Sequence, residues 1–147
     1  MTESVTEPGR ILPRPTAVSE PYWQGCAEGE LRLQRCADCG RHQFYPRIFC
    51  SHCGGQDLAW EAVAGTGRIA SYTVVRRGVS RAYEAPYVIA LIDLDVGVRL
   101  MSQIAVSDPD DQRLNVGAAV TVTFAKWSAE VTVPLFELTQ ERLAPSQ

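Results

Sequence analysis

Four of the five cysteines stand in two CxxC pairs, and this spacing constrains the fold more than any other feature of the sequence. The pairs are Cys36/Cys39 and Cys50/Cys53, with ten residues between them. A CxxC pair turns its two thiols toward one point, and a second pair about one hairpin away completes the tetrahedron of sulfurs that Zn²⁺ prefers. We therefore predict a metal site formed by Cys36, Cys39, Cys50 and Cys53.

A glycine follows each pair, at Gly40 and Gly54. Glycine tolerates the positive φ that lets backbone amides turn toward thiolates, so the two segments are typical of metal knuckles. With four thiolates the site has no open position, which indicates a structural zinc ion rather than a catalytic one. Iron in a rubredoxin-like site is the alternative, because both metals accept four thiolates. His42 lies beside the knuckles and His52 inside the second one, and both are expected not to be ligands.

The fifth cysteine, Cys26, stands ten residues before the cluster. No residue near it in the sequence suggests a lowered pKa, so we expect a small buried side chain. A role as a thioester nucleophile is the alternative.

Changes in composition divide the chain into four parts. Residues 1–17 contain Pro8, Pro13 and Pro15 and are predicted to form a flexible, extended arm. Residues 18–61 are predicted to hold a short helix, with Ser19 as N-cap and Pro21 in its first turn, followed by a rubredoxin-like zinc ribbon. Residues 62–139 form the third part, and residues 140–147 a tail.

The third part has the pattern of a small β barrel. Its runs are rich in Val, Ile, Thr and aromatic residues and are separated by turn residues: 68–76, 87–95, 99–107, 118–127 and 130–138. Within the ribbon, Phe44-Tyr45-Pro46 is predicted to be a returning strand. Five short strands with a longer insertion after the third favour an OB-fold barrel over a two-sheet sandwich. The predicted fold is therefore mainly β, with an N-terminal helix and zinc ribbon before a five-stranded OB fold.

Charge and hydropathy limit the classes of function. The chain has 17 acidic and 14 basic residues, a net charge of -3, whereas nucleic-acid-binding modules carry a basic excess. No apolar run reaches the length of about 20 residues that a membrane span needs, and the polar start is unlike a signal peptide, so a cytoplasmic location is expected. We find no combination of nucleophile, base and acid typical of a catalytic site.

The order of these parts resembles a known family. The segments that carry the resemblance are RCADCGRHQFYPRIFCSHCGG, GRIASYTVV, APYVIALIDLD and VTVPLFEL, spread between about Glu20 and Leu138. They resemble the DUF35 family, in which a rubredoxin-like zinc ribbon precedes an acyl-CoA-associated OB fold. The resemblance implies a non-catalytic accessory subunit in a hetero-oligomer. Its partner would be a thiolase-like enzyme: a thiolase, a lipid-transfer-protein-like aldolase of steroid side-chain degradation, or a hydroxymethylglutaryl-CoA synthase. A MaoC-type hydratase is a further implied partner.

Arg76, Arg77 and Arg81 cluster in one predicted connection between strands. Guanidinium groups bind phosphates in a bidentate manner, so these residues are candidates for the phosphates of CoA or an acyl-CoA at a shared site. Solvated surface arginines are the simpler interpretation. The alternative function from a different class is a nucleic-acid-binding ribbon and OB module, because OB folds hold single strands with aromatic and basic side chains.

Overall fold

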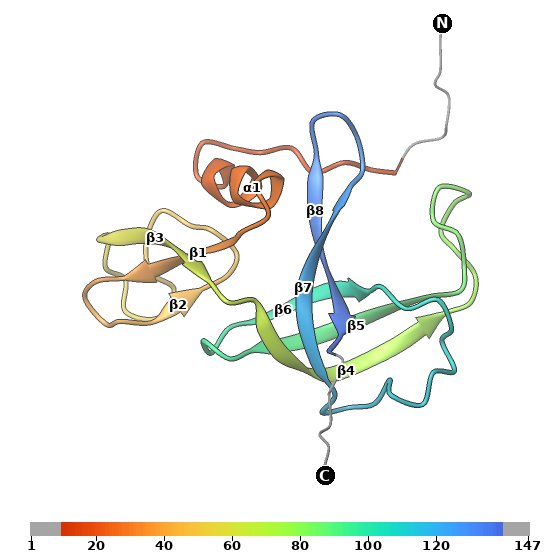
Figure 1. Cartoon of the computed structure of the whole chain (residues 1–147). Helices are drawn as coiled ribbons and strands as arrows, with labels where there is room; N and C mark the ends of the chain where they lie inside the picture. The colour runs from red at the N-terminus through yellow and green to blue at the C-terminus, as the bar shows by residue number, and fades with distance from the viewer. Residues whose placement is uncertain (1–9, 140–147) are drawn as a thin grey trace, which may run out of the picture.

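The structure, a computed structural model, describes residues 10–139 and contains one helix and eight strands within that range (Figure 1). The predicted tail and residues 1–9 of the predicted arm lie outside the described residues. The elements are α1 (Glu20–Ala27), β1 (Leu31–Cys36), β2 (His42–Gln43), β3 (Leu58–Val63), β4 (Thr66–Val75), β5 (Tyr87–Leu94), β6 (Arg99–Ile104), β7 (Ala119–Lys126) and β8 (Thr132–Leu138). Within the described part of the chain, no helix has the length and hydropathy to cross a bilayer.

The helix begins after Ser19, as predicted, but Ser19 does not cap it in the predicted way. No side-chain hydrogen bond from Ser19 reaches the first turn of α1. Instead, the Ser19 hydroxyl accepts a hydrogen bond of 2.9 Å from the amide of Thr16. Ser19 thus ties the preceding chain to the start of the helix.

The ribbon is a three-stranded antiparallel sheet in the order β2-β1-β3. The predicted return strand at Phe44-Tyr45-Pro46 is wrong, because β2 ends at Gln43. Phe44 and Tyr45 leave the sheet to pack on the helix, where their rings lie 5.4 and 6.0 Å from the ring of Tyr22. Aromatic contacts with Tyr22 take the place of further strand pairing.

The second half of the chain is a closed barrel with the strand order β4-β5-β6-β8-β7. The pairs are antiparallel except for β6 and β8, which are parallel and meet at Ile104 and Phe136. The residues of β5 alternate between the interior and the outside, with Val88, Ala90, Ile92 and Leu94 buried. This topology confirms the predicted zinc ribbon region followed by a five-stranded OB-like barrel.

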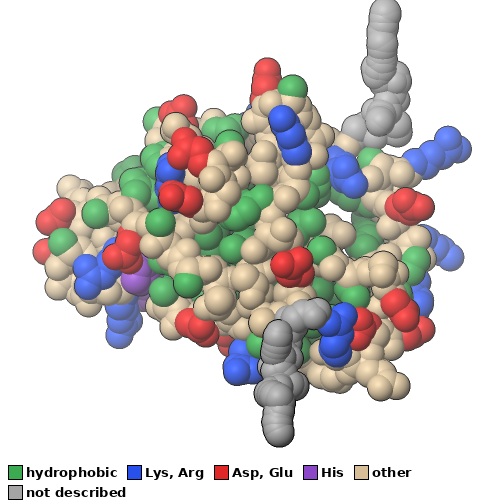
Figure 2. Space-filling view, viewed as in Figure 1, with side chains coloured by type: hydrophobic (Ala, Val, Ile, Leu, Met, Phe, Trp, Pro, Cys, Tyr) green, Lys and Arg blue, Asp and Glu red, His purple; other side chains and the backbone are tan. Residues whose placement is uncertain are grey.

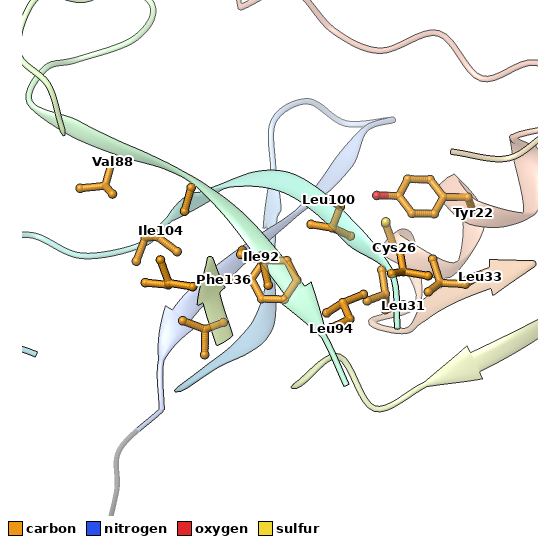
Figure 3. Close-up of a cluster of buried hydrophobic side chains, with 14 of the residues drawn as sticks. Tyr22, Cys26, Leu31, Leu33, Val88, Ile92, Leu94, Leu100, Ile104 and Phe136 are labelled. Atoms are coloured by element: carbon orange, nitrogen blue, oxygen red, sulfur yellow. The ribbon is translucent and has the colours of Figure 1, made fainter. Parts of the chain in front are cut away.

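One hydrophobic core runs through both halves of the molecule. Tyr22 and Cys26 of α1 and Leu31 and Leu33 of β1 belong to the same buried cluster as the barrel residues Ile92, Leu94, Leu100 and Phe136 (Figure 3). The predicted boundary between residues 61 and 62 falls inside β3, which pairs with β1 along its full length. The ribbon, helix and barrel are therefore packed as one unit.

The passage from ribbon to barrel runs through Gly65, which has a φ of +74° and is buried. Its carbonyl accepts a hydrogen bond of 2.8 Å from the amide of Val122 in β7, and an added Cβ would overlap the Val122 side chain. Gly97 also has a positive φ, +96°, but its Cβ would meet open space. An alanine at Gly97 would add only backbone strain, whereas an alanine at Gly65 would add both strain and steric overlap.

We predict that Gly65→Ala lowers the free energy of unfolding by about 2 to 4 kcal/mol, because left-handed strain and overpacking both act. The matched control Gly97→Ala should cost only about 1 to 2 kcal/mol, from strain alone. Urea denaturation of the two variants measures both values. Equal losses in the two variants would contradict this account of the junction.

Candidate metal centre and apolar groove

The four predicted cysteines converge on one point. All four Sγ atoms lie within 4.8 Å of one another, with 3.6 Å between Cys36 and Cys53 and 3.7 Å between Cys39 and Cys50. A disulfide bond is about 2.05 Å long, so these sulfurs are separate thiols. In a tetrahedral zinc site with Zn–S bonds of about 2.3 Å, neighbouring sulfurs lie about 3.8 Å apart. The arrangement fits a structural zinc ion.

The two knuckles have matching backbone geometry. The Gly40 amide donates to the Cys36 carbonyl at 2.7 Å, and the Gly54 amide donates to the Cys50 carbonyl at 2.9 Å. Both glycines have positive φ, +78° and +82°, as their position after the CxxC pairs predicts. The His52 amide donates to the Cys50 sulfur at 3.3 Å. The backbone thus closes each turn around its pair of thiols.

The thiols of this cluster differ in acidity. Desolvation opposes ionisation of Cys50, but hydrogen bonds from the backbone of Cys53 and His52 outweigh it and lower the pKa of Cys50 to about 6. At Cys53, a hydrogen bond from the Gly55 backbone favours the thiolate, but hydrogen bonding with Cys36 and desolvation raise the pKa to about 12. Four thiols this close cannot all ionise without a cation, and a divalent metal would remove that conflict.

A buried pair of glutamines supports the second knuckle, and sequence reasoning missed it. Gln34 and Gln43 are only 5% and 3% exposed, and the Gln43 amide donates to Gln34 Oε1 at 2.6 Å. Gln34 also bonds the backbone of Arg47 in both directions, at 2.8 and 2.9 Å, and Gln43 accepts from the Ser51 amide at 2.7 Å. The pair therefore fixes the loop that leads into Cys50.

Neither histidine joins the sulfur cluster. Among the described residues, the cysteines are the one group of three or more metal-ligating side chains close enough to share an ion. His42 contacts the carboxylate of Glu61 through Nε2, and His52 Nε2 lies 3.2 Å from the His42 carbonyl oxygen. Both rings are occupied by contacts that brace the ribbon.

Cys26 is part of the hydrophobic core. It is 1% exposed, and burial raises the pKa of its thiol to about 12 despite a hydrogen bond from Tyr22. A nucleophilic cysteine needs an accessible thiolate, which this environment disfavours. The geometry therefore supports the interpretation of Cys26 as a buried hydrophobic residue and not as a thioester nucleophile.

An apolar groove of about 440 Å³ lies where α1, the ribbon and the barrel meet. Its lining is mostly aromatic and aliphatic: Tyr22, Trp23, Phe44, Tyr45, Val79, Tyr83, Tyr87, Ile89, Met101, Ser102, Gln103, Trp127, Val133, Pro134 and Leu135. Trp23 Nε1 donates to the Tyr45 hydroxyl at 3.2 Å, which joins helix and ribbon at one wall. In the space-filling view, hydrophobic side chains gather between α1 and the barrel, and charged side chains lie mainly at the edges (Figure 2). Exposed apolar surface of this kind marks a site for a partner or a ligand.

The three candidate arginines lie beside this groove and not in it. Arg76, Arg77 and Arg81 are exposed on the connection between β4 and β5, and Arg76 lies 3.8 Å from the carboxylate of Asp110. The same connection supplies Val79 and Tyr83 to the groove lining. The arginines therefore share one loop, and that loop forms part of the groove wall.

The chain matches known families in both halves. Residues 23–59 match the rubredoxin-like zinc ribbon domain of ChsH2, and residues 60–125 match the C-terminal OB-fold domain of ChsH2. A solved structure named "Ltp2-ChsH2(DUF35) aldolase" superposes with a TM-score of 0.77 and 31% identity, over 86% of this chain and 98% of that one. A DUF35-family protein of unknown function from Sulfolobus solfataricus, 17% identical with a TM-score of 0.59 over 85% of this chain and 87% of that one, shares the fold.

Curated relatives include longer proteins. A probable enoyl-CoA hydratase alpha subunit from Thermomonospora curvata is 34% identical over 88% of this chain, which spans 41% of that protein. The 3-oxo-4,17-pregnadiene-20-carboxyl-CoA hydratase alpha subunit of Mycobacterium tuberculosis is 31% identical over 73% of the chain, which spans 34% of it. A DUF35 domain-containing scaffold protein from Methanothermobacter thermautotrophicus is 36% identical over 65% of this chain and 72% of its own length. With its zinc ribbon, OB-fold barrel and these relatives, the chain belongs to the DUF35 family.

Proposed function

We propose that this chain is a non-catalytic accessory subunit of an acyl-CoA enzyme complex, in which a thiolase-like partner performs the chemistry. The observation that carries this proposal is the apolar groove, which is lined by residues of the helix, the ribbon and the barrel. Cys26 is buried in the core, and none of the five cysteines belongs to the described lining of this groove. The similar chain in the Ltp2-ChsH2 aldolase supports a thiolase-like partner of the lipid-transfer-protein-like type.

A thiolase or a hydroxymethylglutaryl-CoA synthase is an alternative thiolase-like partner within the same proposal. The two relatives named as hydratase alpha subunits support a second partner, a hydratase of the MaoC type. The proposed role of the subunit is to stabilise its partner and to help form the acyl-CoA site. A cytoplasmic location stays a prediction.

The nucleic-acid-binding alternative is weaker because the chain carries a net charge of -3. Nucleic-acid affinity depends on releasing counterions from phosphates, which requires clustered cations. Salt-sensitive retention of the purified chain on heparin would favour this alternative over the accessory role.

We propose that Cys36, Cys39, Cys50 and Cys53 hold a structural zinc ion, because their four sulfurs converge at separations that suit the corners of a zinc tetrahedron. Elemental analysis of the purified chain should give about one zinc per chain. Cys39→Ser should lose most of the metal, whereas the matched control Cys26→Ala should keep it. No zinc in the unmodified chain would contradict the proposal, and iron with a red chromophore would select the rubredoxin-like alternative.

We further propose that the thiolase-like partner docks on the apolar groove. Met101 tests this contact, because it lines the groove and is 68% exposed. Trp23 and Tyr45 also line the groove, but Trp23 donates a hydrogen bond to Tyr45 and both rings contact the buried ring of Tyr22, so their replacement would disturb the fold. Met101→Ser should weaken association with the thiolase-like subunit about fivefold or more, measured by calorimetry on the purified pair.

The matched control for this test is Val116→Ser. Val116 is 66% exposed, almost the same as Met101, but lies in the loop before β7 and outside the groove. The Val116→Ser variant should leave association with the thiolase-like subunit unchanged. If Met101→Ser also binds normally, the partner does not dock on this groove.

Arg76, Arg77 and Arg81 are proposed to assist binding of the CoA phosphates in the complex. Replacing one phosphate-contacting arginine by Ala should raise the KM of the complex for acyl-CoA about fivefold or more, because a charged hydrogen bond is lost, with little change in kcat. Arg68→Ala is the control, since Arg68 lies near the opposite end of β4. An unchanged KM in all three Ala variants would leave the subunit a purely structural role.

A further inference from the structure

The segment before the helix is tied to the body of the molecule at both of its ends. At its helix end, the Ser19 and Glu20 amides both donate to the Thr16 carbonyl, at 3.1 and 2.8 Å, and the Ser19 side chain is buried. From there, residues 10–15 lie against the turn between β7 and β8, where they line a cavity together with Ser128, Glu130 and Val131. In Figure 1 this segment, in red, runs from α1 across the upper end of the barrel.

At its other end, the segment contacts two aromatic residues from different parts of the barrel. The guanidinium of Arg10 lies 4.8 Å from the ring centroid of Trp127 and 5.9 Å from that of Tyr83. The amide of Ile11 donates a hydrogen bond of 2.9 Å to the Tyr83 hydroxyl. The two rings meet edge to face at 6.3 Å. Both Tyr83 and Trp127 also line the apolar groove.

Tyr83 belongs to the connection 76–86, in which short local contacts accompany one exposed ion pair of 3.8 Å from Arg76 to Asp110. The Tyr83 amide bonds the Ser80 carbonyl at 3.2 Å, and the Ala82 amide bonds the Ser80 hydroxyl at 3.2 Å. Gly78 lies so close to the Tyr83 carbonyl that a Cβ could not fit between them. These local contacts shape the connection but do not fix its position on the barrel. At Tyr83, contacts from Arg10, Ile11 and Trp127 attach the connection to the rest of the molecule.

We propose that residues 10–15 form a latch that holds the 76–86 connection in place as one wall of the apolar groove. Arg10 acts by stacking on Trp127 and Tyr83, and Ile11 acts by its hydrogen bond to Tyr83. Because the connection carries Val79, Tyr83 and the three arginines, the latch sets the position of both the apolar wall and the nearby positive charge. The shape of the groove then depends on a segment that lies more than sixty residues away in the sequence from the wall that it holds.

Hydrogen–deuterium exchange of the isolated full-length chain tests this latch without any partner or CoA. Arg10→Ala should raise exchange of the amides in 78–86 about two- to fivefold, because an exposed cation–π contact is lost. Tyr83→Phe keeps the aromatic ring but removes the hydroxyl that Ile11 binds, and should raise exchange in the same segment. The double variant should exchange little faster than the faster single variant, because both changes open one latch.

Arg14→Ala is the matched control, since Arg14 lies in the same segment and in the same cavity lining as Arg10. It should leave exchange of 78–86 as it is in the unmodified chain. The proposal is overturned if Arg10→Ala has no larger effect on 78–86 than Arg14→Ala. It is also overturned if exchange rises evenly over the whole chain, because the contact would then stabilise the fold in general and not this connection.

Discussion

Burial of β1 against the helix and the barrel is the interaction on which the rest of the structure depends. Leu31 and Leu33 are in the shared core, and Cys36, at the end of the same strand, belongs to the sulfur cluster. One strand of six residues therefore connects the metal site to the hydrophobic core. A short ribbon buries too little apolar surface to be stable alone, so metal ligation and packing on the barrel complement each other.

This arrangement explains how a small chain can present a defined surface to a partner. The glutamine pair Gln34 and Gln43 fixes the ribbon loop, and the aromatic residues after β2 pack on α1 instead of extending the sheet. The helix, the ribbon and the barrel form the walls of the groove, and the shared hydrophobic core holds these three parts together. A preorganised surface loses less entropy on association than a mobile one, which suits the accessory role that we propose.

Much of the fold could be predicted from the sequence because its signals are local. The CxxC spacing identified the sulfur cluster, and the five β-rich runs identified the barrel. Features that depend on register or tertiary packing could not be predicted. Gln34 and Gln43 face each other only once β1 and β2 pair, and the hydrogen bonding of Ser19 depends on the path of the preceding chain. The sequence did not predict the shared core, because the composition changes near residue 62 although the buried cluster includes residues on both sides of that point.

The central claim is that metal site, helix and barrel form one cooperative unit. The most direct test is hydrogen–deuterium exchange at the amides of barrel-core residues such as Ile92, followed during thermal unfolding with zinc bound and after chelation. Our account predicts that chelation lowers the unfolding temperature of the barrel amides together with that of β1. Barrel amides that open at the same temperature with and without the metal would contradict it.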